Sequence, residues 1–200
     1  MTLHPGQHRR MRNRETYHHG QLRDDLIDEA EALIGNVGPQ GWSMREAARR
    51  LGVSQAAPYR HFTSKDALID AVVLRGYSQL EYQYVDALNL CDNDQDRLAE
   101  VAIAYFHFAI AKPGLFTLMF SSLRLQAAGE ATSSYRVFED EIAAAQSRGE
   151  LPIASASEQA QLLWAAAHGI ADLVNRGVFS KRHGSGVAAS LIRCVIKGLS

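Results

Sequence analysis

The chain has 200 residues, of which 46% are hydrophobic, so it can bury a sizeable core in one large or two small domains. The composition excludes a disordered or fibrous protein, and the formal net charge of −1 at pH 7 excludes a surface that is basic throughout. Because we find neither a run of about 18 apolar residues nor a secretory signal, we expect a cytoplasmic protein without a transmembrane helix.

The amino-terminal segment, residues 1–16, is a basic arm. Its arginines are Arg9, Arg10, Arg12 and Arg14, and its lone acidic residue is Glu15. Such an arm is too polar to bury and should move freely in solution. It is either a solvated tail or an arm that follows DNA phosphates or enters a minor groove.

The first two helices are predicted from apolar spacing and from the signals at their ends. Apolar residues recur at helical spacing over about residues 18–37, and Gly38-Pro39 ends this helix. The second helix opens with a capping box, in which the Ser43 hydroxyl and the Glu46 carboxylate each satisfy an amide at the helix start.

A glycine turn separates the second helix from a short third one. Gly52 ends the second helix at about Leu51, because the residue after a helix often needs a positive φ. Ser54 then caps a third helix over about residues 55–61. Pro58 falls in its first turn or just past it, where a missing amide costs far less than in a helix interior.

The rest of the chain predicts further helices and no strand. A long fourth helix, capped by Thr63 or Ser64, connects the compact first three to a larger helical body. The further expected helices lie at about 95–111, 115–122, 135–149, 155–175 and 186–199. We therefore expect an all-α fold of about nine helices. A three-helix helix-turn-helix domain would occupy residues 17–64, and a helical regulatory and dimerisation domain residues 65–200.

Helix, glycine turn and helix are the elements of a helix-turn-helix DNA reader. A recognition helix must approach DNA closely, so its leading residues have to be small or hydrogen-bonding. Gln55 can bond adenine N6 and N7, and an alanine methyl can touch a thymine methyl. Tyr59 and His61 can donate to phosphates and fix register. Lys65 can do the same, helped by the dipole at the start of the fourth helix.

A family resemblance lies in the stretch WSMREAARRLGVSQAAPYRHFTSKDALIDAV, which closely resembles the DNA-binding domain of TetR/AcrR-type transcriptional regulators. It rests on the capped second helix, an alanine pair, LGVS, a Y-x-H-F quartet and K-x-x-L leading into a long helix. Near the carboxyl end, WAAAHGIADL resembles the tryptophan, histidine-glycine signature of one subgroup of that family. Two departures are Ala57 and Pro58, where many members have a threonine and a leucine.

The resemblance implies roles for individual residues at the DNA. Arg45 sits where members reach a guanine, and Gln55 and Ala56 occupy base-facing positions. The phosphate-contacting positions are those of Ser43, Tyr59, His61 and Lys65. Arg60 lies at a variable position, where base, phosphate and solvent all stay open. Simpler alternatives are a solvated Arg45, a packing role for Tyr59 and a surface position for His61.

The two carboxyl-terminal helices, at about 155–175 and 186–199, are more apolar than a surface helix. A twofold dimer in which each copy gives both helices to a four-helix interface would cover them, as the resemblance also implies. The alternative is that both helices are wholly internal to a large monomer core.

The middle of the chain is rich in aromatic and flexible apolar residues. If the resemblance holds, some of them line an inducer cavity, which is mostly apolar with a few polar groups. The candidates are Tyr105, His107, Phe108, Phe116, Met119, Phe120, Trp164 and His168. The alternative is that most are core residues. For His107 and His168, the best polar candidates, this means hydrogen-bonded core histidines.

Cys91 and Cys194 are the only cysteines, lie far apart and match no metal-ligand spacing. We expect two reduced thiols in or near the core, because free cysteine is among the most buried residue types. We expect no metal site and no cofactor.

These features predict a DNA-binding transcriptional regulator. The sequence does not show the direction of control, and the resemblance implies a repressor, because most members of the family repress and some activate. It would bind a palindromic operator as a homodimer and be released by a small apolar or amphipathic ligand. Two alternatives stay open: a DNA-binding dimer without a small-molecule inducer, and a helical enzyme with a catalytic histidine. Because the sequence has no nucleophile motif, phosphate-binding glycine loop or metal-spaced cluster, we expect no enzyme. We also expect no membrane partner.

Overall fold

The computed structural model describes residues 19–121, 131–179 and 181–199, so the predicted basic arm lies outside the described residues. The elements in chain order are α1 (His19–Val37), α2 (Met44–Arg50), the 3-10 helix η1 (Pro58–Arg60), α3 (Lys65–Leu90), η2 (Asp94–Asp96), α4 (Arg97–Ala111), α5 (Pro113–Met119), α7 (Ala131–Ser147), α8 (Ala156–Asn175) and α9 (Lys181–Gly198). This part of the chain holds eight α-helices and no strand, which confirms the predicted all-α fold.

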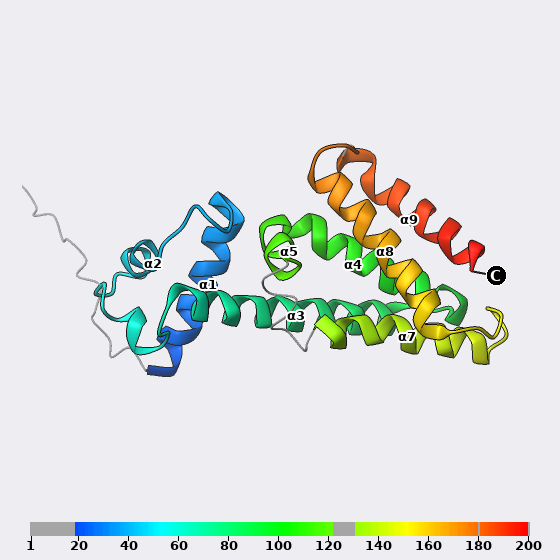
Figure 1. The fold of residues 1–200 in the computed structure, drawn as a ribbon, viewed down its shortest axis with the longest axis horizontal. Coiled ribbons are helices and arrows are strands. Elements are labelled where there is room, and N and C mark those ends of the chain that lie inside the picture. Colours follow the sequence, from blue (N-terminus) through cyan, green and yellow to red (C-terminus); the bar gives the residue numbers. More distant parts are fainter. Residues whose placement is uncertain (1–18, 122–130, 180, 200) are drawn as a thin grey trace, which may run out of the picture.

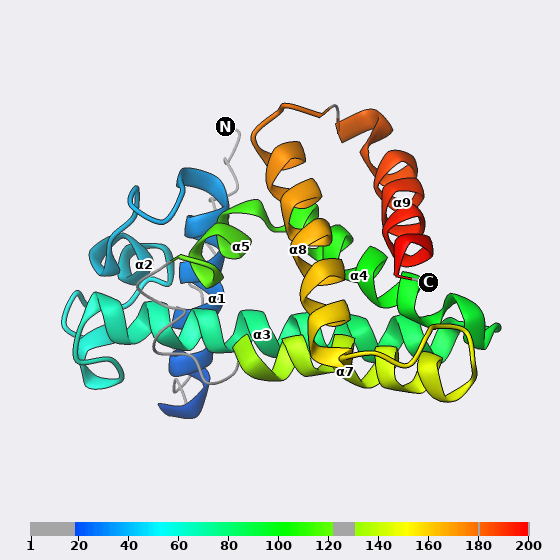
Figure 2. The same cartoon turned by 45° about the vertical axis from the view of Figure 1, so that its right-hand side comes forward.

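The long helix α3 connects the two ends of the molecule. Its amino-terminal half packs against α1, which in turn contacts α2, and the remainder runs along the helical body (Figure 1). α4 lies at the centre of that body, in contact with α3 and also with α7, α8 and α9. α8 and α9 run side by side, on the side of α4 away from α3 (Figure 2). α3 is therefore shared by the helical body and the amino-terminal helices.

α4 is the most apolar of the long described helices and supplies much of the core. Val101, Tyr105 and Phe108 on this helix are all 0% exposed. No single described helix is long and apolar enough to cross a membrane. η2 with α4 and the following α5 would qualify only as a pair, which is bent by 110°. The apolar side chains of α4 thus pack against the surrounding helices.

The first helix caps follow the prediction, with one difference. The Ser43 hydroxyl accepts a hydrogen bond from the Glu46 amide at 3.2 Å, and Gly52 has the predicted positive φ of 70°. The Glu46 carboxylate does not complete the capping box. It accepts instead from Arg49 at 2.8 Å and 2.7 Å and from Arg50 at 3.0 Å, because guanidinium donors are charged and lie one helical turn away.

The predicted third α-helix is wrong in type and length. Residues 55–57 form a turn, and only Pro58–Arg60 is helical, as the 3-10 element η1. Pro58 has no amide, so it cannot donate the α-helical bond to the Ser54 carbonyl. That carbonyl accepts instead from the Ala57 amide at 2.9 Å, which is the tighter 3-10 spacing. The segment 55–61, which we call the recognition segment, is consequently a turn followed by a short 3-10 helix rather than one α-helix.

Glycines allow α5 to dock closely on the amino-terminal end. A Cβ on Gly114, at the start of α5, would lie 2.7 Å from the carbonyl oxygen of Ile34 on α1. A Cβ on Gly76 of α3 would lie 2.7 Å from the sulfur of Met119, at the end of α5. Both ends of this short helix are therefore in contact with elements that hold the helix-turn-helix.

A polar network of three residues, the Lys112 clasp, joins the same elements. The ammonium of Lys112, between α4 and α5, donates to Glu31 of α1 and to Gln79 of α3, each at 2.7 Å. The Gln79 amide donates to the second Glu31 oxygen at 3.0 Å. Because each member pairs with the other two, the clasp fixes α1, α3 and the α4–α5 junction relative to one another.

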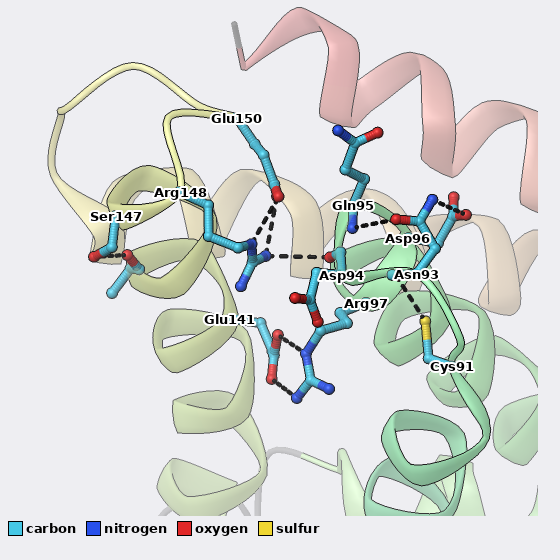
Figure 3. Close-up of polar contacts among 11 residues, drawn as sticks. Cys91, Asn93, Asp94, Gln95, Asp96, Arg97, Glu141, Ser147, Arg148 and Glu150 are labelled. Carbon is cyan, nitrogen blue, oxygen red and sulfur yellow. Dashed lines mark hydrogen bonds and ion pairs between the residues drawn. The ribbon is translucent and has the colours of Figure 1, made fainter.

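Ion pairs, shown in Figure 3, hold the end of the body that lies away from α1 and α2 in Figure 1. Arg97 of α4 donates to both carboxylate oxygens of Glu141 on α7, at 3.1 and 2.9 Å. Glu141 is 8% exposed, and its carboxylate raises the pKa of Arg97. Arg148 donates to Glu150 at 2.7 and 3.0 Å and to the carbonyl of Asp94 at 3.2 Å. These contacts fix the start of α4 against α7 and the loop that follows it.

Candidate functional site

The residues predicted to contact DNA gather at one end of the molecule, on α2, the turn before η1, η1 itself and the start of α3 (Figure 1). Most of them are exposed, namely Ser43, Arg45, Gln55, Ala56, Tyr59 and Arg60. Tyr59 is 54% exposed, so its ring is open to contact with a partner. His61 and Lys65 are only partly buried and lie beside this exposed set.

The arginines near this surface fall into two groups. Arg49 and Arg50 share the Glu46 carboxylate, and these guanidinium hydrogen bonds, that from Arg49 first, lower the pKa of Glu46 to about 2. Within the described ranges, no carboxylate lies at salt-bridge distance from Arg45 or Arg60. Among the described arginines of α2 and η1, Arg45 and Arg60 therefore carry positive charge that no described carboxylate neutralises.

Lys65 has a structural contact that sequence reasoning missed. Its ammonium donates to the carbonyl of Trp42 at 2.8 Å and lies 4.8 Å from the centroid of the Trp42 ring. This contact holds the loop before α2 against the start of α3. An ammonium has three donors, so the predicted phosphate contact of Lys65 needs one of the remaining two.

His61 is less accessible than its neighbour Tyr59. The side chain is partly buried, and its Nε2 atom is shielded from solvent. The predicted phosphate contact would therefore have to use the other ring nitrogen. The backbone amide of His61 cannot substitute, because it donates to the Pro58 carbonyl at 3.0 Å.

Five of the residues predicted to bind a ligand form one aromatic cluster, which consists of Tyr105, Phe116, Phe120, Trp164 and His168. The centroid of the His168 ring lies 5.0 Å from the ring centroids of Phe116 and Phe120 and 5.5 Å from that of Trp164. Tyr105 and Phe116 are buried, whereas the other three are partly buried. The aromatic cluster thus has a buried floor and an accessible rim.

One short hydrogen bond lies inside the aromatic cluster. The hydroxyl oxygen of Tyr105 is 2.6 Å from Nδ1 of His168. Burial raises the pKa of Tyr105, with a further contribution from Tyr77 and a partial offset from the donor group of Trp164. Burial also lowers the pKa of His168, partly offset by the negative charge of Asp172. Both groups are therefore neutral near pH 7.

The other three predicted ligand-binding residues lie elsewhere. His107 is exposed, because two residues along a helix rotate a side chain by about 200° away from the direction of Tyr105. Phe108 is 0% exposed within the core, and Met119 packs against Gly76 of α3. We therefore assign His107 to the surface, and Phe108 and Met119 to the packing core.

The two carboxyl-terminal helices leave apolar surface uncovered in the single chain. α9 buries Ala188 and Ile192 against the body. Large apolar side chains on α8, α9 and the loop between them are exposed, namely Leu162, Leu173, Val178, Phe179, Val187 and Leu191. The alternative in which both helices are wholly internal to a monomer core is therefore wrong.

The two cysteines differ in burial and belong to no metal-binding group in the described ranges. Cys91 is partly buried, and Cys194 is exposed on α9, so the expectation of a core position is wrong for Cys194. Among the residues that the structure describes, no group of three or more His, Cys, Asp or Glu side chains could hold a metal ion.

The Lys112 clasp is the feature that sequence reasoning missed entirely. Its hydrogen bonds join residues 81 and 33 positions apart, so no local spacing relates Lys112 to Glu31 or Gln79. The only nearby signal is the Pro113-Gly114 break directly after Lys112, and it marks a helix junction without indicating what the junction contacts.

Comparison with known proteins gives matches over both parts of the chain. A family model for bacterial regulatory proteins of the tetR family matches residues 26–72. A second model, for a tetracyclin repressor-like carboxyl-terminal domain, matches residues 98–196. A solved protein of unknown function from Rhodococcus sp. RHA1 is 31% identical, with a TM-score of 0.80 and coverage of 92% of this chain and 97% of that one.

Two named relatives have partial matches. The class C tetracycline repressor protein of Escherichia coli is 46% identical over 50 residues, which are 25% of this chain and 23% of the repressor. The HTH-type transcriptional regulator Rv1816 of Mycobacterium tuberculosis is 26% identical over 140 residues, covering 66% of this chain and 60% of the relative. The matches thus span less than two thirds of the length of each of these relatives. The two family models nevertheless cover the helix-turn-helix end and most of the helical body, and the chain belongs to the TetR family of bacterial transcriptional regulators.

Proposed function

We propose that the protein is a transcriptional repressor that binds a palindromic DNA operator as a homodimer and is released by a small apolar or amphipathic ligand. The observation that carries the DNA-binding part is the exposed end built from α2 and η1. Gln55 and Ala56 are exposed there, as are Arg45 and Arg60, two guanidinium groups without a described acidic partner. Such groups can pair with guanine or with phosphate, while Gln55 suits adenine.

The proposed dimer uses the apolar surface of α8 and α9. In the single chain, Leu162 is 61% exposed and Val187 is 46% exposed, on helices that lie side by side. Two copies of this pair of helices would form a four-helix interface related by a twofold axis. The two recognition segments would then read half-sites about 34–36 Å apart, or a multiple of that distance.

The proposed ligand site is the accessible rim of the aromatic cluster. Phe116 of α5 lies in that cluster, and Gly114 at the start of the same helix touches α1. A ligand that favours one position of α5 over another would shift the population between two spacings of the recognition segments. Operator release then follows from the difference in the ligand's affinity for the two forms.

Operator selection from random duplexes with the purified protein tests the DNA-binding part. We expect a palindromic consensus, bound with an affinity that falls steeply with salt. Arg45→Ala should relax the preference at one base of each half-site, by about 1–3 kcal/mol. Arg49→Ala is the matched control, because Arg49 is an exposed arginine on the same helix that pairs with Glu46. Equal binding to all duplexes would contradict the proposal.

Sedimentation equilibrium tests the dimer. Leu191→Glu places a charge on the exposed apolar face of α9, where Leu191 is 39% exposed, and should dissociate the dimer without unfolding the chain. A protein that is monomeric before substitution would exclude the twofold arrangement. A dimer that selects an operator but is never released by any small molecule would instead favour the second candidate, a regulator without an inducer.

A further inference from the structure

The direction of the hydrogen bond between Tyr105 and His168 follows from its surroundings. The Tyr105 hydroxyl has one proton to donate, and within the described ranges His168 Nδ1 is the acceptor that it reaches, at 2.6 Å. The Trp164 ring, whose centroid lies 6.4 Å from that of Tyr105, offers no acceptor, because an indole N–H can only donate. If His168 Nδ1 carried a proton instead, the buried hydroxyl would be left without an acceptor, which proteins rarely tolerate. Tyr105 therefore donates to His168.

This direction fixes the tautomer of His168. A neutral imidazole whose Nδ1 accepts a hydrogen bond carries its proton on Nε2. Among the described residues, no acceptor pairs with Nε2, although the ring is only partly buried. The aromatic cluster thus presents one polar group on its accessible side, an N–H donor set among Phe116, Phe120 and Trp164.

We propose that the Nε2–H group of His168 is the specificity donor of the ligand site, and that the ligand is a flat, uncharged apolar molecule that carries a carbonyl acceptor. This inference rests on the proposed ligand site. The rings of Phe120 and Trp164 would contact the flat part of the ligand, and the carbonyl would accept from His168. An apolar molecule without an acceptor would leave a buried donor unpaired, which costs affinity.

The charges around His168 favour an uncharged ligand over an anion. From α8, Asp172 lies one turn away and is the charged group whose field reaches the imidazole. From α4 and α5, the groups in contact are Tyr105, Phe116 and Phe120, none of which is charged near pH 7. A carboxylate ligand would therefore meet a negative neighbour and no described cation in this cluster.

A matched set of probes tests the proposal: 2-acetylnaphthalene, 2-ethylnaphthalene and 2-naphthoate. The first two differ by a carbonyl in place of a methylene, and the third adds a negative charge. Equilibrium dialysis against the full chain gives each dissociation constant. We expect 2-acetylnaphthalene to bind about tenfold or more tightly than 2-ethylnaphthalene, because only the first satisfies the donor. We expect 2-naphthoate to bind more weakly than 2-acetylnaphthalene.

Three variants assign the donor. His168→Phe keeps a ring in the cluster and should remove the preference for the carbonyl, while binding of 2-ethylnaphthalene persists. Tyr105→Phe keeps its ring but frees the tautomer of His168, and should reduce the preference by part of its value. His107→Phe is the matched control, because His107 is an exposed histidine on the same helix as Tyr105. It should leave the preference unchanged.

Several results would overturn the proposal. These are equal affinities for the two neutral probes, tightest binding of 2-naphthoate, no binding of either neutral probe, or an unchanged preference in His168→Phe. Operator binding and thermal melting, measured on every variant, show whether each one is folded. A protein that selects an operator but does not discriminate the probes refutes this inference alone. A protein that discriminates the probes but binds no operator refutes the proposed function alone.

Discussion

Removal of the ammonium from the Lys112 clasp is the most direct test of how the two ends of the molecule are joined. The substitution Lys112→Met keeps the aliphatic stem and deletes the charge. It removes two hydrogen bonds of 2.7 Å, one to Glu31 and one to Gln79. Among the described residues, one hydrogen-bond donor to the Glu31 carboxylate then remains, the Gln79 amide at 3.0 Å.

The expected loss of stability follows from the burial of the pair. The side chains of Lys112 and Glu31 are 37% and 18% exposed, so the pair lies between a surface ion pair and a buried one. Exposed pairs contribute about 0–1 kcal/mol, whereas removal of one partner of a buried pair costs about 3–5 kcal/mol. With solvent screening at Lys112 taken into account, we expect Lys112→Met to lower the free energy of unfolding by about 1–2 kcal/mol.

Urea unfolding followed by circular dichroism, at one fixed protein concentration, measures this free energy. A double-mutant cycle with Glu31→Gln should give a coupling energy of about 1 kcal/mol between the two positions. Arg176→Met is the control, because Arg176 pairs with Asp172 at 2.6 Å but the two side chains are 71% and 43% exposed. If Lys112→Met changes stability no more than this control, or if the cycle is additive, the clasp does not join the two ends.

Three further predictions concern packing, a half-buried ion pair and acid sensitivity. Gly114→Ala should destabilise the protein by about 1–3 kcal/mol in urea unfolding, because the new Cβ would lie 2.7 Å from the backbone oxygen of Ile34. Glu141→Ala should cost about 1–3 kcal/mol by the same assay, since it leaves the guanidinium of Arg97 partly buried without its carboxylate. The pKa of Glu46 falls from 4.5 to about 2 on folding, so its stabilisation is present above pH 4.5 and is lost as the pH falls towards 2. Wild type should accordingly lose more stability than Glu46→Gln over that interval, and parallel acid-unfolding curves would show that the pairing has no such effect.

Local signals explain which parts of the fold could be predicted from the sequence. The start of α2 at Ser43 and the turn at Gly52 depend on neighbouring residues, and both were predicted correctly. Pro58 is also a local signal, but by itself it indicates only that the first turn of a helix tolerates it. Because Pro58 cannot donate to the Ser54 carbonyl, that carbonyl accepts from Ala57 instead, and the residues after Ser54 form a turn and a 3-10 helix. The residue type alone does not show which donor takes the place of the missing amide.

The candidate ligand site likewise has features that local sequence predicts and features that depend on the tertiary structure. Helical spacing alone separates His107 from Tyr105, because two positions along a helix face away from each other. It does not show that His168, which is 63 residues further along than Tyr105, accepts a hydrogen bond from it. Composition identified the aromatic residues of the middle region, and only the tertiary structure distinguishes those in the aromatic cluster from Phe108, which fills the core.

The short helix α5 is the element through which an event at the aromatic cluster would reach the DNA-binding end. Phe116 lies 5.0 Å from the ring of His168, whereas Gly114, two residues earlier, touches the backbone of α1. α5 spans only Pro113–Met119. Because so short a helix is closely packed along its length, a ligand that displaces the Phe116 ring should move one end of α5. The end at Gly114 is held by backbone contact and by the adjacent Lys112 clasp. We therefore expect Lys112→Met to reduce the change in operator affinity that a bound ligand causes more than it reduces operator affinity without ligand. If the substitution reduces both quantities equally, the coupling runs along α3 instead.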